Sequence, residues 1–134
     1  MERTSLITRL LIGKASDYSS LTLESGLPNA ASLTAYFQEV PLVLEQADVK
    51  ERTKDSPQGQ IRRIDIRANI HRDSDFHRNF IHQQVMAYYE TANGEQELVG
   101  NDAYPLSYNY ERDSGAGNAD NRFTTLLLSE TLPV

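Results

Sequence analysis

Residues 85–100 read Val-Met-Ala-Tyr-Tyr-Glu-Thr-Ala-Asn-Gly-Glu-Gln-Glu-Leu-Val-Gly, and this stretch decides the fold. The Asn93-Gly94 pair separates two segments with the composition of β-strands. Both residues tolerate the positive φ angles that the two central positions of a type I′ turn require, and the twist of such a turn matches that of the paired strands. The stretch therefore predicts a tight antiparallel hairpin with Asn93-Gly94 at its tip.

A longer hairpin is predicted over residues 40–70. Apolar and polar side chains alternate along residues 64–70, a period of two that is typical of a strand with one buried and one wet face. Residues 40–53 predict the partner strand, and the connection over residues 54–59 is rich in turn-forming residues. Because both strands become polar toward this connection, we expect the tip to extend beyond the core, into solvent or onto a partner.

One short helix of two to three turns is expected near residues 75–84. Ser74 or Asp75 is suited to cap its start. Phe76, Phe80 and Ile81 then fall at i, i+4 and i+5, which gives one apolar stripe.

Three further strands complete the prediction. They cover residues 4–12, 106–111 and 122–130, and a loop over residues 112–121 joins the last two. A chain of 134 residues has room for one core and not for two ordinary domains. The fold class predicted is therefore mainly β: a single domain over residues 1–134, built as an antiparallel β barrel or sandwich of six to eight strands.

Composition excludes several classes of protein. No cysteine is present, which excludes disulfides and thiolate chemistry, and the net charge of −6 argues against general affinity for nucleic acid. No apolar run is long enough to span a membrane. The beginning of the chain lacks the basic leader of an export signal, so the cytoplasm is the expected location.

The charges are unevenly distributed. Residues 50–82 hold eight Lys and Arg against five Asp and Glu, whereas the rest of the chain holds five against fourteen. This pattern indicates either a solvated face on the long hairpin or two complementary surfaces that meet in neighbouring subunits. On the second interpretation the candidate subunit contacts are Lys50, Arg52, Lys54, Arg62, Arg63, Arg67, Asp113 and Asp120.

Metal and catalytic motifs are weak. His71 and His77 with Asp73 and Asp75 offer mixed nitrogen and oxygen ligands, but surface histidines explain them better. The loop over residues 113–121 has the oxygens that calcium prefers without the EF-hand spacing. We therefore expect no catalytic residues, no metal and no cofactor, and a protein that is not an enzyme.

Tyrosine is concentrated in the C-terminal half. Tyr88 and Tyr89 are adjacent, so their side chains point to opposite sides of a strand, and at least one is expected to face outward if the sheet has a wet face. Tyrosines of this kind either pack across strands in a core or serve an interface.

Residues of about 85–130 resemble a known class. Glu97-Leu98-Val99-Gly100-Asn101, then Tyr104-Pro105-Leu106, then Asp113-Ser114-Gly115 and a closing Thr- and Leu-rich strand resemble the C-terminal half of small β proteins encoded in phage and prophage tail modules. The resemblance implies a virion structural protein such as a tail tube, terminator or connector subunit. It also implies assembly into rings. Proteins of this class have no catalytic residues, so the resemblance assigns none to this chain.

The expected function is therefore structural. We expect a homo-oligomer, with a hexamer as one expected size, which contacts other virion or tail proteins, and neither sequence-specific nucleic acid nor a membrane. Its expected location is the host cytoplasm during assembly and then the virion or tail-like particle. Two alternatives stay open: a monomeric β-sandwich binding module for carbohydrate or protein, and a small β-barrel enzyme or hydrolase accessory.

Overall fold

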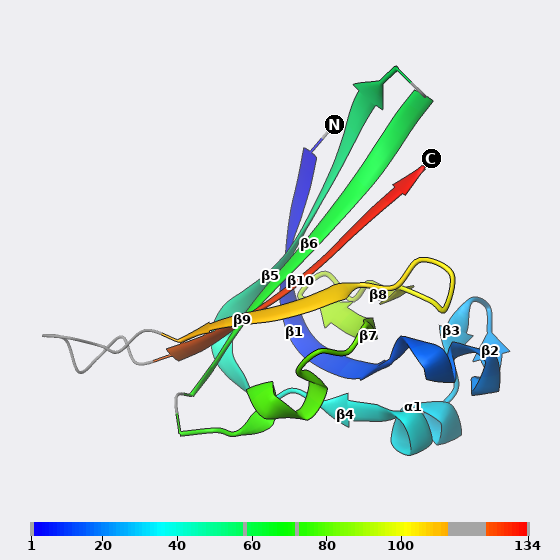
Figure 1. Ribbon diagram of the computed structural model, residues 1–134. Helices are drawn as coiled ribbons and strands as arrows, with labels where there is room; N and C mark the ends of the chain where they lie inside the picture. Colours follow the sequence, from blue (N-terminus) through cyan, green and yellow to red (C-terminus); the bar gives the residue numbers. More distant parts are fainter. Residues whose placement is uncertain (1, 58, 72, 113–122, 134) are drawn as a thin grey trace, which may run out of the picture.

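The computed structural model describes residues 2–57, 59–71, 73–112 and 123–133 (Figure 1), with the backbone alone at positions 2–4, 44, 54, 56 and 131–133. Its elements, in chain order, are β1 (Glu2–Lys14), η1 (Ala15–Ser20), β2 (Leu23–Glu24), β3 (Leu27–Pro28), α1 (Ala30–Tyr36), β4 (Phe37–Glu39), β5 (Leu42–Ser56), β6 (Gly59–His71), η2 (Phe76–Phe80), β7 (Val85–Thr91), β8 (Gln96–Val99), β9 (Ser107–Arg112) and β10 (Phe123–Pro133). The predicted mainly β, antiparallel fold class is confirmed.

Eight strands form one antiparallel sheet in the order β8-β7-β1-β5-β6-β10-β9, with β4 also paired to β1. β1 changes partner along its length, because residues 2–6 pair with β5 and residues 7–14 pair with β7. A register shift after Ile7 marks the change, as expected of a bulge that bends a strand. Val85 and Leu106 form an isolated bridge between opposite ends of the sheet. Within the described residues the sheet therefore curls into a sandwich-like body that is not closed.

The long hairpin is confirmed as β5 and β6, which pair out to Ser56 and Gly59. Its predicted inner face is buried as well, because Ile64, Ile66 and Ile70 are at most 1% exposed. Together with the ends of β1 and β10, the hairpin extends far beyond the body (Figure 1). We call this four-stranded part the projecting sheet; it comprises residues 2–6, 48–56, 59–67 and 127–133.

The hairpin of residues 85–100 is also confirmed, but its turn is not of the predicted type. The Thr91 N–H donates to the Glu95 carbonyl at 2.9 Å, and the Gly94 N–H donates to the Thr91 carbonyl at 3.0 Å. Of the two predicted turn residues, Gly94 alone has a positive φ, of 83°. The loop is therefore a three-residue turn with glycine in the left-handed position rather than a two-residue type I′ turn.

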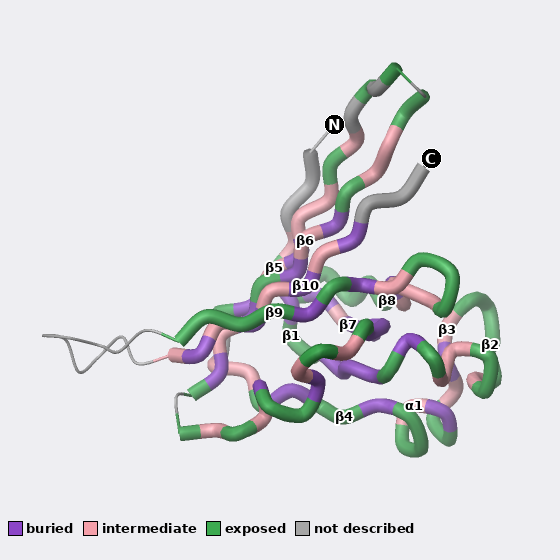
Figure 2. The backbone as a smooth tube through the Cα atoms, in the orientation of Figure 1, coloured by how far each residue is buried: buried purple, intermediate pink, exposed green. Residues whose placement is uncertain are grey.

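Both faces of β7 are buried. The larger hydrophobic cluster, inside the curled sheet, contains Tyr89, whereas the smaller cluster on the other face contains Met86 and Tyr88. Figure 2 shows the buried path of β7 in purple. Tyr88 and Tyr89 are 4% and 3% exposed, so both pack in a core, one of the two expected roles, and β7 does not have the wet face on which an outward tyrosine depended. The reason is that side chains from η1, α1 and the strands between them, such as Tyr18 and Leu33, cover the outer face.

The helix predicted near residues 75–84 is shorter and of another kind. η2 is a five-residue 3₁₀ helix, which places Phe80 in the larger cluster with Phe76 packed against it. His82 has a φ of 60°, so a helix cannot continue through it. The one α-helix of the described residues is α1, where the Asn29 side chain caps the start by accepting from the Ser32 N–H at 2.9 Å.

Candidate interaction surface

The outer face of the projecting sheet carries a mixed set of charges. Successive residues of a strand point to opposite sides, so every second position of β5 and β6 contributes to this face. The side chains line a groove of about 710 Å³ between the projecting sheet and β9. Its charged lining residues are Asp48, Lys50, Arg52, Arg63, Asp65, Arg67 and Glu111.

Asp65 pairs with two arginines in this groove. One of its carboxylate oxygens lies 3.1 Å from Arg63 Nε and 3.7 Å from Arg52 Nη2. The Asp65 side chain is 30% exposed, and the two arginine side chains are 55% and 49% exposed. Because exposed ion pairs contribute only ~0–1 kcal/mol, a carboxylate from a partner can replace Asp65 at little cost. The arginines of this groove are therefore available to an acidic surface.

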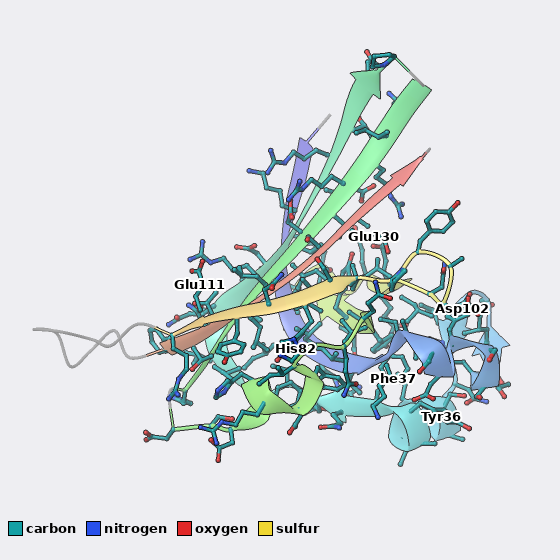
Figure 3. The ribbon with its side chains drawn as sticks, in the orientation of Figure 1. Tyr36, Phe37, His82, Asp102, Glu111 and Glu130 are labelled. Carbon is teal, nitrogen blue, oxygen red and sulfur yellow. The ribbon has the colours of Figure 1, made fainter. Side chains whose placement is uncertain are left out.

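The inner face of the projecting sheet becomes polar beyond the core. Arg62 Nη1 lies 3.8 Å from Glu51 Oε1, and Arg62 Nη2 lies 3.9 Å from Glu130 Oε1. Figure 3 labels Glu130 near the base of the projecting sheet. Burial raises the pKa of the Glu130 carboxyl, while the Arg62 charge and a hydrogen bond from the Gly100 backbone act in the opposite direction. Glu130 is thus a buried acid whose charge is only partly compensated.

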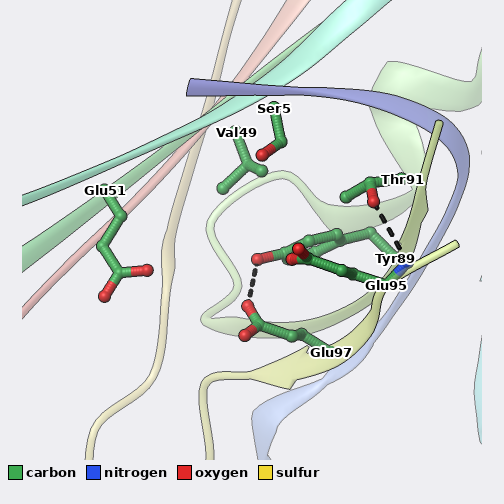
Figure 4. Close-up of a pocket in the computed structure, with 7 residues that line it drawn as sticks. All are labelled: Ser5, Val49, Glu51, Tyr89, Thr91, Glu95 and Glu97. Atoms are coloured by element: carbon green, nitrogen blue, oxygen red, sulfur yellow. Dashed lines mark hydrogen bonds between the residues drawn. The ribbon is translucent and has the colours of Figure 1, made fainter. Parts of the chain in front are cut away.

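A second polar group lies under the same face. The Tyr89 hydroxyl donates a hydrogen bond to the Glu97 carboxylate (Figure 4). Both side chains border a cavity of about 10 Å³ that Ser5 and Glu51 also line. This volume is about what one water molecule needs, so the cavity is too small for an organic ligand.

The structure divides the candidate contact residues between two faces. Arg62 lies on the inner face, near Glu51 and Glu130. The four that share the outer groove are Lys50, Arg52, Arg63 and Arg67. Outside the described residues lie the side chain of Lys54 and the loop residues Asp113 and Asp120.

The histidines are the remaining candidate residues. In the part of the chain that the structure describes, no three His, Asp or Glu side chains are placed to hold a metal ion. His77, expected at the surface, is 2% exposed, so that prediction is wrong. The reason is that η2 packs the His77 ring against the Tyr110 ring of β9, with centroids 4.7 Å apart. The calcium alternative concerns residues 113–121, which lie outside the described residues.

Sequence reasoning missed Glu130. Along β10, Thr124, Leu126, Leu128 and Glu130 are all buried and share one face. A charged residue at a position where the alternation places buried apolar residues can be recognised in the sequence. Because buried charges need partners, such a residue indicates a site of interest. The Thr- and Leu-rich composition of the strand obscured it.

Comparisons with known proteins find no counterpart: no protein-family model, no curated protein and no solved structure matches this chain. Among the described residues, no helix has the length and apolar character needed to cross a lipid bilayer. The fold and its surfaces define a mainly β protein with a charged, four-stranded extension, and the functional argument starts from that extension.

Proposed function

We propose that this protein is a structural subunit of a phage tail or a tail-like apparatus, such as a tail tube, terminator or connector, and that it assembles with copies of itself into a ring. On this proposal it is not an enzyme. Its partners are other copies and neighbouring tail proteins, and it passes from the host cytoplasm into the particle. The observation that carries the proposal is the projecting sheet, which has two open edges.

Both edges of the projecting sheet lack a neighbouring strand within the described residues. Residues 2–5 of β1 pair with β5 on one side, and pairing with β7 on the other side begins only at Ile7. β9 pairs with β10 only as far as Ser129, so residues 130–133 pair with β6 alone. An unpaired edge presents backbone N–H and C=O groups that another strand can bind.

The two open edges run in opposite directions. The projecting sheet consists of four antiparallel strands in the order β1, β5, β6 and β10, so its outer strands are antiparallel to each other. A second copy can therefore place its β1 beside the β10 of the first and preserve the antiparallel alternation. A contact of this head-to-tail kind closes into a ring where the rotation permits. The hexamer stays a prediction.

The charges on the outer face support the same proposal. Lys50, Arg52, Arg63 and Arg67 lie in one groove of a protein whose net charge is −6. Complementary charge between two surfaces sets the register of an assembly and speeds association. The resemblance of residues 85–130 to phage tail proteins supports the particular class of assembly.

A proline in the edge of β1 tests the proposal. The Leu6 carbonyl accepts from the Ala92 N–H at 2.9 Å, on the side of β1 away from β5. Alternate residues of an antiparallel strand direct their backbone groups to the same side, so the Thr4 N–H faces the open edge. Thr4→Pro removes this donor and leaves the pairing with β5 intact. Thr4→Val keeps the donor and is the matched control.

Light scattering coupled to size-exclusion chromatography gives the readout. We expect oligomers for the wild type and Thr4→Val, and a shift toward monomer for Thr4→Pro. Circular dichroism and urea unfolding must show that Thr4→Pro is folded. A Thr4→Pro variant that is folded and assembles as well as Thr4→Val would show that this edge is not the contact.

A second candidate function, the monomeric binding module, is favoured by one observation. The outer groove, of about 710 Å³, has the size of a small-molecule site, and it contains Tyr110, which is 39% exposed. Tyr110 supplies one aromatic face on which a sugar ring can stack. A monomer that binds oligosaccharides, with loss of binding in Tyr110→Ala and not in Tyr104→Ala, would favour this function over ring assembly.

A further inference from the structure

A second pocket lies at the base of the projecting sheet. It has a volume of about 140 Å³ and is lined by Tyr18 of η1, the turn residue Gly26, Arg62 and Glu130 of the projecting sheet, and residues 98–101. A water molecule occupies about 30 Å³ of liquid, so this space holds several waters or the head group of a small organic molecule. None of the candidate contact residues except Arg62 belongs to it.

Glu130 lines this pocket and carries a buried oxygen. The residue is 5% exposed, and its Oε2 atom has no hydrogen-bond partner among the residues that the structure describes. A buried acceptor without a donor destabilises the folded state, and more so when the group is charged. Within the described part of the chain, the Glu130 carboxylate therefore lacks one of its donors.

Arg62 does not supply that donor. Its guanidinium is shared between Glu51 and Glu130, at 3.8 Å and 3.9 Å, distances too long for hydrogen bonds. Two carboxylates thus share one guanidinium, and when both carboxylates are ionised the group of three is one positive charge short of neutrality. An anion in the pocket would meet Arg62 but would also lie against the Glu130 carboxylate.

We propose that this pocket binds a small organic cation, an alkylammonium or alkylguanidinium head group, with the Glu130 carboxylate as its acceptor. The cation donates an N–H to the Glu130 carboxylate and supplies the missing positive charge. A charge-assisted hydrogen bond of this kind is stronger than a neutral one. The inference is independent of ring assembly, because the pocket is built within one subunit.

The test uses two simple cations on the full-length protein. Methylguanidinium chloride and ethylammonium chloride are titrated at constant ionic strength, and the backbone amides of Gly100 and Asn101 are followed by NMR. N-methylurea, a neutral molecule of similar shape to methylguanidinium, is the ligand control. We expect saturable shifts with the two cations and none with N-methylurea.

Three variants fix the role of each charge. Glu130→Gln should weaken cation binding at least about tenfold, the effect of ~1.4 kcal/mol. Glu24→Gln removes an exposed carboxylate from β2, next to the turn that holds Gly26, and should leave the affinity unchanged. Arg62→Gln should tighten binding, because the cation then no longer competes with a fixed guanidinium. Damage to the fold would weaken binding in both Glu130→Gln and Arg62→Gln.

Three results would contradict cation binding in this pocket. Absence of saturable shifts, equal shifts from N-methylurea, or unchanged affinity in a folded Glu130→Gln variant would each show that the pocket holds only water.

Discussion

The Tyr108 hydroxyl of β9 donates a hydrogen bond to the backbone carbonyl of His77 in η2, at 2.9 Å. The contact is buried, and it connects the 3₁₀ segment to the outermost strand of the sheet. Burial also raises the pKa of the Tyr108 hydroxyl above the ordinary tyrosine value, so the group stays a neutral donor. This bond therefore fixes the short 3₁₀ helix against the sheet.

Tyr108→Phe should therefore destabilise the protein by about 1 kcal/mol, because a buried hydrogen bond between η2 and β9 is lost. Tyr110→Phe removes a hydroxyl from a residue that is 39% exposed and should have little effect. Urea unfolding of both variants measures the difference. Equal stability of Tyr108→Phe and wild type would mean that water replaces the hydroxyl.

The turn of the β7–β8 hairpin makes a second prediction. Gly94→Ala should cost about 1 kcal/mol, because the φ of 83° suits glycine and strains other residues. Asn93→Gly should destabilise or have no effect, since Asn93 lies outside the positive-φ region and glycine is entropically unfavourable there. A stabilising Asn93→Gly substitution, measured by thermal unfolding, would indicate the two-residue turn instead.

Glu130 should make stability depend on pH. Its pKa is raised in the folded state, so the folded protein holds this proton more tightly than the unfolded chain does. Stability from this group is therefore greatest below the unfolded pKa and is lost as the pH rises through the folded pKa. Glu130→Gln should be more stable than wild type at neutral pH, because the amide removes a negative charge that burial disfavours.

The pH effect is checked by urea unfolding of wild type and Glu130→Gln across the acidic range and at neutral pH. The difference in the free energy of unfolding between Glu130→Gln and wild type should become smaller as the pH falls. An advantage that grows toward acid would mean that the folded state favours the charged carboxylate.

The outer groove should contribute to self-association. Arg67→Glu reverses one charge in the groove and should raise the dissociation constant for assembly several-fold, because it would then repel an acidic partner surface. Arg78→Glu makes the same change on η2, at an exposed position outside the groove, and is the control. Sedimentation velocity at low and high salt measures both. Equal effects of the two substitutions would assign the change to net charge alone.

Local alternation predicted much of the fold. The apolar face of Ile64, Ile66 and Ile70 on β6 and the turn residues at Asn93-Gly94 each contain their signal within a few neighbouring residues. The two hairpins, β5–β6 and β7–β8, follow directly from those patterns.

The burial of Tyr88 and His77 could not be derived from the local sequence, because distant segments decide it. Tyr88 is buried because residues from η1 to α1 fold over β7, and His77 is buried because η2 packs against β9. Neither contact can be predicted from the pattern of neighbouring residues in the sequence. Because neighbouring residues of a strand point to opposite sides, the sequence around Arg62 and Arg63 was enough to predict that the arginines lie on two faces. The pocket at Glu130 could not be predicted in this way, because it is formed by residues from five separate segments.

The molar mass of the purified wild-type protein in solution, measured by light scattering over a wide range of concentrations, tests the central claim most directly. Assembly through the edges of the projecting sheet predicts a defined multiple of the 15.1 kDa chain mass that persists on dilution until a single dissociation transition. A mass of 15.1 kDa at every concentration and at low salt would contradict it.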